Sequence, residues 1–187
     1  GKMRVVAGIV KNKKLKTKDG NETRPTLERV KEAIFSIIGD KVVDSNFLDL
    51  YSGSGSIAIE ALSRGAKKAI LIEQDRDAIK IIIENINSCR FEKKSRAYKN
   101  DVNRAIEILH RKAEFFDIVF LDPPYKENVS EGTIKKLSDC KLLKENGMII
   151  SEHSNYEKLP DEIGEFVKYD ERDYNKKILS FYKYKEN

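Results

Sequence analysis

The sequence has 187 residues, a net charge of +5, and 40% hydrophobic and 36% charged residues. This length suits one domain with a substantial core, and the hydrophobic content excludes a disordered chain. No stretch approaches the roughly 18 to 20 apolar residues that a membrane span needs, and the sequence from Gly1 opens no signal peptide. We therefore expect a cytoplasmic protein without membrane contact, and a monomer.

Basic residues are concentrated near the N-terminus. Residues 1–31 contain ten basic and three acidic residues, a net charge of +7, whereas the other 156 residues sum to −2. Clustered Lys and Arg side chains gain affinity for polyanions because they release counterions from phosphates. This segment therefore predicts contact with a nucleic acid, and the alternative is a solvated lysine loop. The residues expected to make the contact are Lys11, Lys13, Lys14, Lys16 and Arg24.

The N-terminal part of the chain predicts a strand, a loop and a helix in that order. Residues 3–10 alternate and are β-branched, which predicts a strand, and the lysine-rich residues 11–22 predict a hairpin loop. Apolar residues then recur at helical spacing up to Gly39, so a helix is expected over 26–38.

Strands and helices alternate through the rest of the chain. Short apolar runs separated by helices of ten or so residues predict an α/β fold with a mostly parallel sheet covered on both faces. The last two runs, 164–174 and 177–184, have hairpin spacing and predict an antiparallel edge. The expected strands are 47–51, 69–73, 95–100, 116–122 and 147–153, and the expected helices are 56–64, 75–87, 102–113 and 131–138. Ligands of such sheets bind at the carboxyl ends of the strands, near the point where the strand order reverses.

A glycine turn and three acidic residues lie at these expected strand ends. Gly53 and Gly55 follow the strand 47–51 and allow backbone N–H groups to approach a ligand closely. Asp49 lies within that strand, Glu73 ends the next one, and Asp101 follows the third. A carboxylate at the position of Glu73 can accept both hydroxyls of a ribose, and one at the position of Asp101 can accept from an adenine amino group.

The acidic character of this turn favours one class of cofactor over another. Asp49 beside the glycines would repel a pyrophosphate and attract an ammonium group. S-adenosylmethionine carries an ammonium, a sulfonium and no phosphate, so it suits the turn better than NAD does. The alternative is that Glu73 only faces solvent at its strand end.

The tetrapeptide Asp122-Pro123-Pro124-Tyr125 ends the apolar run "FDIVFL". The prolines fix φ and supply no N–H, so they end the strand. Asp122 and a carbonyl of the proline pair provide two acceptors, and Tyr125 provides a flat face. This combination suits the exocyclic amino group of a nucleic-acid base, because both N–H protons are held and the base can stack. A base inside a duplex would not reach it, so the substrate is expected to be single-stranded, looped or flipped.

The cysteines and histidines predict no metal site. Cys89 and Cys140 lack CxxC spacing, which predicts two free thiols in a reducing compartment. His110 and His153 lack partners at ligand spacing, so each is expected to be solvated or hydrogen-bonded within the protein.

The chain resembles class I S-adenosylmethionine-dependent methyltransferases, and most closely the RsmD-type family of bacterial 16S ribosomal RNA guanine(966)-N2 methyltransferases. The resemblance implies a Rossmann-like sheet of seven strands with a basic N-terminal β-hairpin, in one methyltransferase domain 1–187 divided into an extension 1–25 and a catalytic core 26–187. It also implies methylation of N2 of a guanine in 16S rRNA, within the 30S subunit. The stretches that carry it are "MRVVAG", "TRPTLERVKEAIFSI", "LDLYSGSGSIAIEALSRGA" and "FDIVFLDPPY".

The resemblance also implies roles for individual residues. Asp122 to Tyr125 match the catalytic motif, and residues 24–26 match an arm that closes over the methionine end of the cofactor. The family commonly has an arginine-tyrosine-glycine stretch where this chain has "RDYN", so no role follows for Tyr174. The residues that match the cofactor site are Arg24, Thr26, Asp49, Tyr51, Ser52, Gly53, Gly55, Glu73 and Asp101.

Three alternatives stay open on sequence alone. An adenine-N6 DNA or RNA methyltransferase shares the proline motif, although a larger target-recognition domain would not fit in this length. A glutamine-N5 protein methyltransferase usually has Asn in place of Asp122. A non-catalytic RNA-binding ribosome assembly factor could have kept the cofactor fold without the reaction.

Overall fold

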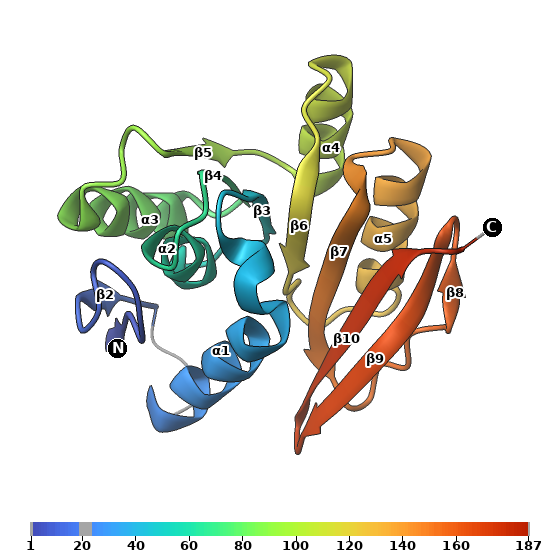
Figure 1. Cartoon of the computed structure of the whole chain (residues 1–187), viewed down its shortest axis with the longest axis horizontal. Coiled ribbons are helices and arrows are strands. Elements are labelled where there is room, and N and C mark those ends of the chain that lie inside the picture. The colour runs from blue at the N-terminus through green and yellow to red at the C-terminus, as the bar shows by residue number, and fades with distance from the viewer. Residues whose placement is uncertain (1, 19–23, 187) are drawn as a thin grey trace.

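A mixed β-sheet forms the centre of the described part of the chain (Figure 1). The computed structural model describes residues 2–18 and 24–186. The strand order is β5-β4-β3-β6-β7-β10-β9-β8. Its five parallel strands are β3 (Asn46–Leu50), β4 (Lys68–Glu73), β5 (Ser95–Lys99), β6 (Phe116–Leu121) and β7 (Leu143–Ser154). Its antiparallel strands are β8 (Glu162–Ile163), β9 (Phe166–Tyr174) and β10 (Lys177–Tyr184).

The expected α/β fold with an antiparallel edge is confirmed, but the sheet has eight strands in the described residues where seven were expected. The additional strand is the two-residue β8, which pairs with the start of β9 across a tight turn. Gly164 makes this turn at a φ of 56°, a conformation that favours glycine. The turn buries Ile163 and Phe166 in the same core cluster, which accounts for the short strand.

The strand order reverses between β3 and β6. From β3 the chain moves to β4 and then β5 on one side, and returns to place β6 and then β7 on the other side. All five parallel strands point the same way, so their carboxyl ends meet at one edge of the sheet. This edge, at the point where the strand order reverses, is where open α/β sheets bind their ligands.

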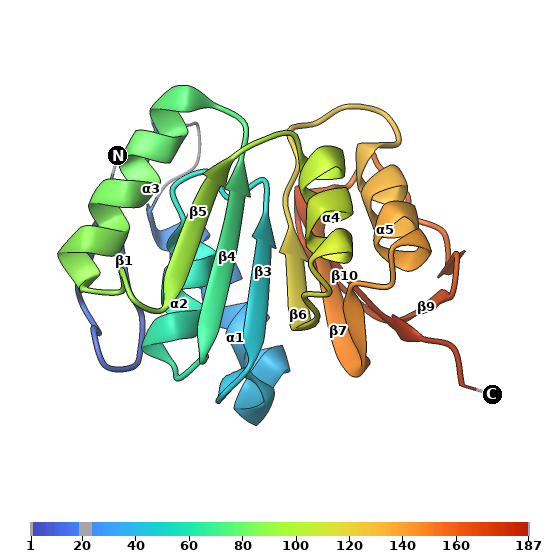
Figure 2. The same ribbon diagram turned by 90° about the horizontal axis from the view of Figure 1, so that it is seen from above.

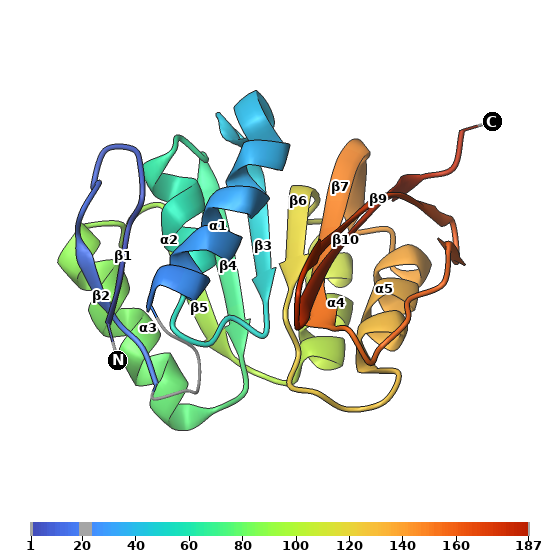
Figure 3. The same ribbon diagram turned by 90° about the horizontal axis from the view of Figure 1, so that it is seen from below.

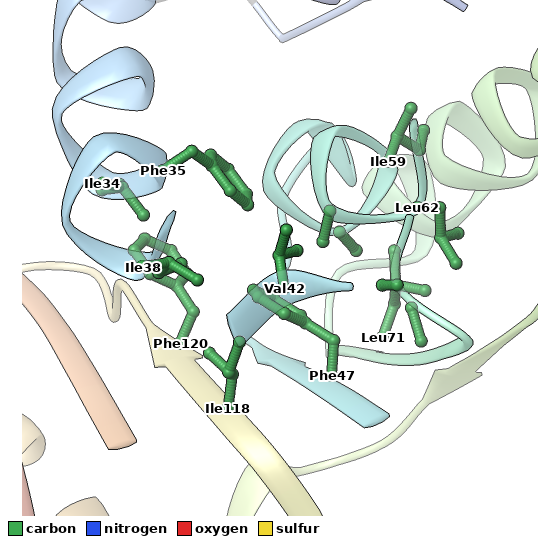
Figure 4. Close-up of a cluster of buried hydrophobic side chains, with 14 of the residues drawn as sticks. Ile34, Phe35, Ile38, Val42, Phe47, Ile59, Leu62, Leu71, Ile118 and Phe120 are labelled. Atoms are coloured by element: carbon green, nitrogen blue, oxygen red, sulfur yellow. The ribbon is translucent and has the colours of Figure 1, made fainter. Parts of the chain in front are cut away.

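Helices cover both faces of the sheet. In Figure 2 α4 (Val102–Arg111) and α5 (Val129–Asp139) lie in front of the sheet, and Figure 3 shows the sheet from the opposite side, behind α1 (Arg24–Ile38) and α2 (Ser56–Ser63). One core cluster joins the first three helices to the sheet (Figure 4), and a second cluster joins the last two helices to the other face. The helices are α1 (Arg24–Ile38), α2 (Ser56–Ser63) and α3 (Arg76–Cys89) on the first face, and α4 (Val102–Arg111) and α5 (Val129–Asp139) on the second.

The helix predictions are confirmed to within two residues at each end, and the short 3-10 helix η1 (Gly39–Val42) follows α1. The predicted boundary at residue 25 between extension and core falls inside the first turn of α1. No helix of the described residues is long and apolar enough to cross a membrane.

The N-terminal hairpin differs from the prediction of a strand over 3–10. Its strands are β1 (Lys2–Arg4) and β2 (Lys14–Lys16), and the hairpin loop is the β-branched stretch between them. The residues after Arg4 do not continue β1, because the backbone amides of this stretch donate hydrogen bonds to α2. Val6 N and Ala7 N donate to the two carboxylate oxygens of Glu60, at 2.9 and 3.0 Å. Gly8 passes so close to α2, at a φ of 91°, that a Cβ would lie 1.9 Å from the Ser63 carbonyl oxygen.

Candidate active site

Four carboxylates lie toward the carboxyl ends of neighbouring strands on one face of the sheet. They are Asp49 in β3, Glu73 at the end of β4, Asp122 directly after β6 and Glu152 in β7. Side chains alternate between faces along a strand, and the residues two positions before each carboxylate belong to the core cluster under α1 to α3. The four carboxylates therefore share the face that carries these three helices.

The glycine turn after β3 is built from left-handed residues. Tyr51, Gly53 and Gly55 have φ values of 59°, 64° and 81°. Ser52 N donates to the Ile72 carbonyl at 3.0 Å, which ties the turn to β4. Gly55 is the N-cap of α2, and a Cβ on it would lie 3.1 Å from Leu71 Cδ2. The turn thus brings the start of α2 to the carboxyl end of β3, as the sequence predicted.

Asp49 is a buried carboxyl group with one unsatisfied oxygen. Its Oδ2 accepts from the Ser52 hydroxyl at 2.8 Å and from Ala58 N at 3.3 Å. Its Oδ1 is buried and has no hydrogen-bond partner among the described residues. Burial, with a smaller contribution from the charge of nearby Glu73, raises the pKa of Asp49 to about 7 against the effect of the two hydrogen bonds, which lower it. A cation or a donor placed at Oδ1 would satisfy this acceptor and favour the ionised form.

This raised pKa predicts a pH-dependent stability. Between its ordinary pKa of 3.8 and about 7, Asp49 binds a proton in the folded protein and has lost it in the unfolded chain. The free energy of unfolding should therefore fall as pH rises through this window, by up to about 1.4 kcal/mol per pH unit. Urea unfolding of wild type and Asp49→Asn from pH 4 to pH 8 checks this. As pH rises, the free energy of unfolding of wild type should fall relative to that of Asp49→Asn. If the two free energies changed in parallel with pH, Asp49 would not have a pKa raised by burial.

Glu73 braces the glycine turn. Its Oε1 accepts from Gly53 N and its Oε2 from Asp75 N, each at 2.8 Å. Each carboxylate oxygen keeps a second lone pair, so the group can accept hydrogen bonds from further donors while its bonds to Gly53 and Asp75 remain. Asn100 N donates to the Glu73 carbonyl at 3.1 Å, which brings Asp101 close to this position.

The other predicted cofactor residues are placed less directly. Asp101 is exposed and caps α4 by accepting from Arg104 N at 3.0 Å. Tyr51 turns its side chain to the opposite face of the sheet, where its hydroxyl lies 2.7 Å from Thr133 Oγ1 and burial raises its pKa. Only the backbone of Tyr51 therefore shapes the glycine turn. The predictions for the side chains of Arg24 and Thr26 lie outside the described residues.

Three residues of the tetrapeptide, Asp122, Pro123 and Tyr125, line a small cavity. Asp122, Pro124 and Tyr125 are exposed, and the Tyr125 ring is 70% exposed, which leaves its face available for stacking. The cavity measures about 230 Å³. It is lined by Asp122, Pro123, Tyr125, Glu152, His153, Ser154, Glu157, Lys176 and Lys177.

Sequence reasoning missed the residues that β7 and β10 contribute to this cavity. Glu152 is buried, and its Oε2 lies 2.8 Å from Lys177 Nζ at the start of β10. Its position in the sequence could have identified Glu152, because "SEH" ends the expected strand 147–153 and the carboxyl end of that strand lies at the site. His153 is hydrogen-bonded within the protein, with Nε2 2.8 Å from Ser180 Oγ, as expected.

The basic hairpin lies beside the glycine turn. Lys11, Lys13 and Lys14 are exposed, and Lys16 forms an ion pair with Glu84 at 2.6 Å. Asn85 of α3 joins the two regions. Its Oδ1 accepts from Lys16 N, and its Nδ2 donates to the carbonyls of Lys16 and Ser54, each at 2.9 Å. The predicted nucleic-acid arm and the predicted cofactor turn are therefore held together by one buried amide.

Tyr174, which the sequence left without a role, contacts α1. The guanidinium of Arg29 lies 5.8 Å from the centroid of its ring, and the ring packs against the first core cluster. This contact brings the turn between β9 and β10 to α1. Within the described residues, no group of three or more His, Cys, Asp or Glu side chains is arranged to hold a metal ion.

The chain is similar to known proteins over most of its length. A model of the family described as "Conserved hypothetical protein 95" matches residues 3–183. The chain is 36% identical over 181 residues to "Putative rRNA methyltransferase YlbH" of Bacillus subtilis (strain 168), covering 97% of this chain and 98% of that protein. It is 34% identical over 160 residues to "Ribosomal RNA small subunit methyltransferase D" of Escherichia coli (strain K12), covering 86% of this chain and 79% of that protein. The solved structure "Putative methyltransferase yhhF from Escherichia coli" matches with a TM-score of 0.84 and 29% identity, covering 98% of each chain.

Proposed function

Because the chain belongs to the RsmD-type family, whose model is described as Conserved hypothetical protein 95, we propose that it methylates the exocyclic N2 of a guanine in 16S ribosomal RNA. The target is of the guanine 966 type in the small ribosomal subunit, and S-adenosylmethionine is the methyl donor. One observation carries the proposal. The Asp122-Pro-Pro-Tyr motif lies at the carboxyl end of β6, the strand next to β3 and its glycine turn.

The residues of the glycine turn fit S-adenosylmethionine. This cofactor supplies an electrophilic methyl group on a sulfonium. Asp49 offers a buried acceptor that lacks a partner, which suits the ammonium group of the methionine end. Gly53 leaves the turn open, because a Cβ there would meet nothing within 4 Å. Glu73 keeps lone pairs for the ribose hydroxyls, and Asp101 lies close by for the adenine amino group.

The motif after β6 holds the amino group that receives the methyl. Asp122 and a carbonyl of the proline pair accept the two N–H bonds of N2, and Tyr125 stacks on the base. An exocyclic amino group is a poor nucleophile because its lone pair is delocalised into the ring. The acidic acceptor favours the pyramidal amino group and stabilises the positive charge that develops on nitrogen. Asp122 need not take the proton during transfer, because the proton is lost readily once the nitrogen is methylated.

The basic hairpin serves as the RNA-binding arm of the single domain. Its lysines are exposed on β2 and the loop before it, and the hairpin is anchored next to the glycine turn through Asn85. An arm in this place can hold the phosphate backbone while a looped or flipped base enters the cavity beside Tyr125.

Methyl mapping tests the proposed function directly. The protein is incubated with labelled S-adenosylmethionine and either unmodified small subunits or naked 16S rRNA, and the modified base is then identified. We expect N2-methylguanine at one position. Label on an adenine N6 would establish the rival methyltransferase, and RNA binding without any transfer would establish the non-catalytic assembly factor.

The arm is tested separately by removing its charge. Replacing Lys11, Lys13 and Lys14 with Ala should weaken RNA affinity at every sequence and flatten its dependence on salt. The slope of log K against log salt should fall by about 0.7 for each single-strand phosphate that the arm no longer neutralises. Affinity titrations from 50 to 300 mM salt measure this, with exposed Lys67 and Lys112 replaced by Ala as the control. An unchanged slope would show that the lysines of the hairpin are only solvated and do not bind RNA phosphates.

A further inference from the structure

A buried acid and a lysine form one wall of the cavity beside Asp122. Glu152 lies in β7 and Lys177 opens β10, and their side chains meet at 2.8 Å. In the β7 and β10 pairing, Glu152 is opposite Leu179 and Lys177 is opposite Ser154, so the ion pair runs diagonally between the strands. Both residues line the cavity together with Asp122, Pro123 and Tyr125.

The sheet register places Glu152 beside Asp122. Leu121 is paired with Ser151 across the parallel strands β6 and β7. Continuing this register by one residue sets Asp122 opposite Glu152, and neighbouring strands are about 4.8 Å apart. Both side chains lie on the face that carries α1, because Phe120 and Ile150, two residues earlier, belong to the core cluster of that face. The cavity therefore presents an acid, then a second acid, and then an ammonium group along one row.

This row matches the donors and acceptors on the Watson–Crick edge of guanine. Along that edge guanine has the N2 amino group, then the N1–H donor, then the O6 acceptor. With N2 held at Asp122, the next group along the edge needs an acceptor and the one after it needs a donor. We propose that Glu152 accepts the N1–H of the target guanine and that Lys177 donates to its O6. This inference rests on the proposed function, and it names the residues that select the base.

The same pair disfavours other bases. Adenine presents an acceptor at N1 and an amino group at the next position, so it would face a carboxylate with a lone pair and an ammonium with N–H bonds. Specificity then comes from unfavourable contacts with the wrong base as well as favourable contacts with guanine. Glu152 and Lys177 also connect β7 to β10, and a purely structural ion pair would be indifferent to the base that is bound.

Replacing the target guanine by 2-aminopurine separates these two roles. This base keeps the amino group at C2, but its N1 is an acceptor and it has no O6. Wild type should methylate guanine RNA with a kcat/KM on the order of 10- to 100-fold above that for 2-aminopurine RNA. Glu152→Gln keeps an oxygen for Lys177 and gains an N–H for N1 of 2-aminopurine. The variant should therefore narrow the ratio at least about tenfold, with an unchanged cofactor Kd.

Matched variants complete the experiment. Glu145 is exposed near the start of β7, at the opposite end of the strand from the cavity, and Glu145→Gln should keep the wild-type ratio. Lys177→Leu removes the donor to O6 and also leaves the Glu152 carboxylate without its ion-pair partner, and it should narrow the ratio by lowering turnover of guanine RNA. A kcat/KM ratio that stays at the wild-type value in either the Glu152 or the Lys177 variant, or that narrows equally in the Glu145 variant, would overturn the assignment. If wild type transfers no methyl to guanine RNA, the proposed function fails, whatever the variants do.

Discussion

Asp122→Ala should lower the kcat of methyl transfer by about 10²- to 10³-fold while the Kd for S-adenosylmethionine stays unchanged. The side chain is exposed at the cavity mouth directly after β6, on the substrate side of the site. Its oxygen would stabilise the amino nitrogen most strongly as positive charge develops, and removing one such group from an active site typically lowers the rate by this amount. Single-turnover transfer and isothermal titration measure the two quantities separately.

Two further variants distinguish a role of Asp122 at the base from a role at the cofactor. Asp122→Asn keeps one acceptor oxygen and should retain part of the rate that the alanine variant loses. Asp139→Ala, an exposed acid at the end of α5, serves as the control and should transfer at the wild-type rate. If cofactor affinity fell together with the rate in Asp122→Ala, the residue would belong to the cofactor site and not to the base.

The local sequence pattern was sufficient to predict the parallel strands of the sheet. The run 116–121, which is apolar except for Asp117, predicted a central strand, and it lies between β3 and β7 with both faces covered. Strand ends then located Asp49, Glu73 and Asp122, since the carboxyl ends of parallel strands meet at one edge. These elements are predictable because their signal lies within a few residues of sequence.

The sequence predictions were wrong or incomplete where contacts between residues far apart in the sequence determine the structure. The segment after β1 has the composition of a strand, but its amides bond to Glu60, more than fifty residues away. The pairing of Glu152 with Lys177 depends on the antiparallel register of β7 and β10. Alternation along β3 would place the Tyr51 side chain on the face of Asp49, but the left-handed φ of Tyr51 turns its ring to the other face, toward Thr133. No local pattern records such contacts.

Glu60 is the buried centre that fixes the hairpin to the rest of the protein. It is fully buried in α2, with Lys31 Nζ at 3.2 Å and Arg64 Nε at 2.8 Å from its carboxylate. Lys31 is also buried and donates to the Arg4 carbonyl at 2.7 Å, and burial lowers its pKa against the attraction of Glu60. With the amides of Val6 and Ala7, the carboxylate satisfies donors from α1, α2 and the hairpin at once.

Glu60→Ala should therefore destabilise the protein by about 3 to 5 kcal/mol, because it leaves the Lys31 ammonium buried without its counter-ion and two amides without an acceptor. Urea unfolding followed by circular dichroism measures this decrease in stability. The hairpin should also detach before the rest unfolds, so limited proteolysis in native buffer should cleave near residues 5–13 in the variant and not in wild type.

The double variant Lys31→Met with Glu60→Gln provides the control for this prediction. It removes both buried charges and keeps the Gln carbonyl oxygen as an acceptor for one of the two hairpin amides, so it should recover part of the stability that Glu60→Ala removes. RNA affinity should follow hairpin attachment and not net charge, falling in Glu60→Ala and returning in the double variant. If RNA affinity stayed at the wild-type level while the hairpin was cleaved, the arm would not be the RNA-binding element. If stability fell equally in both variants, the acceptor role of residue 60 would be wrong.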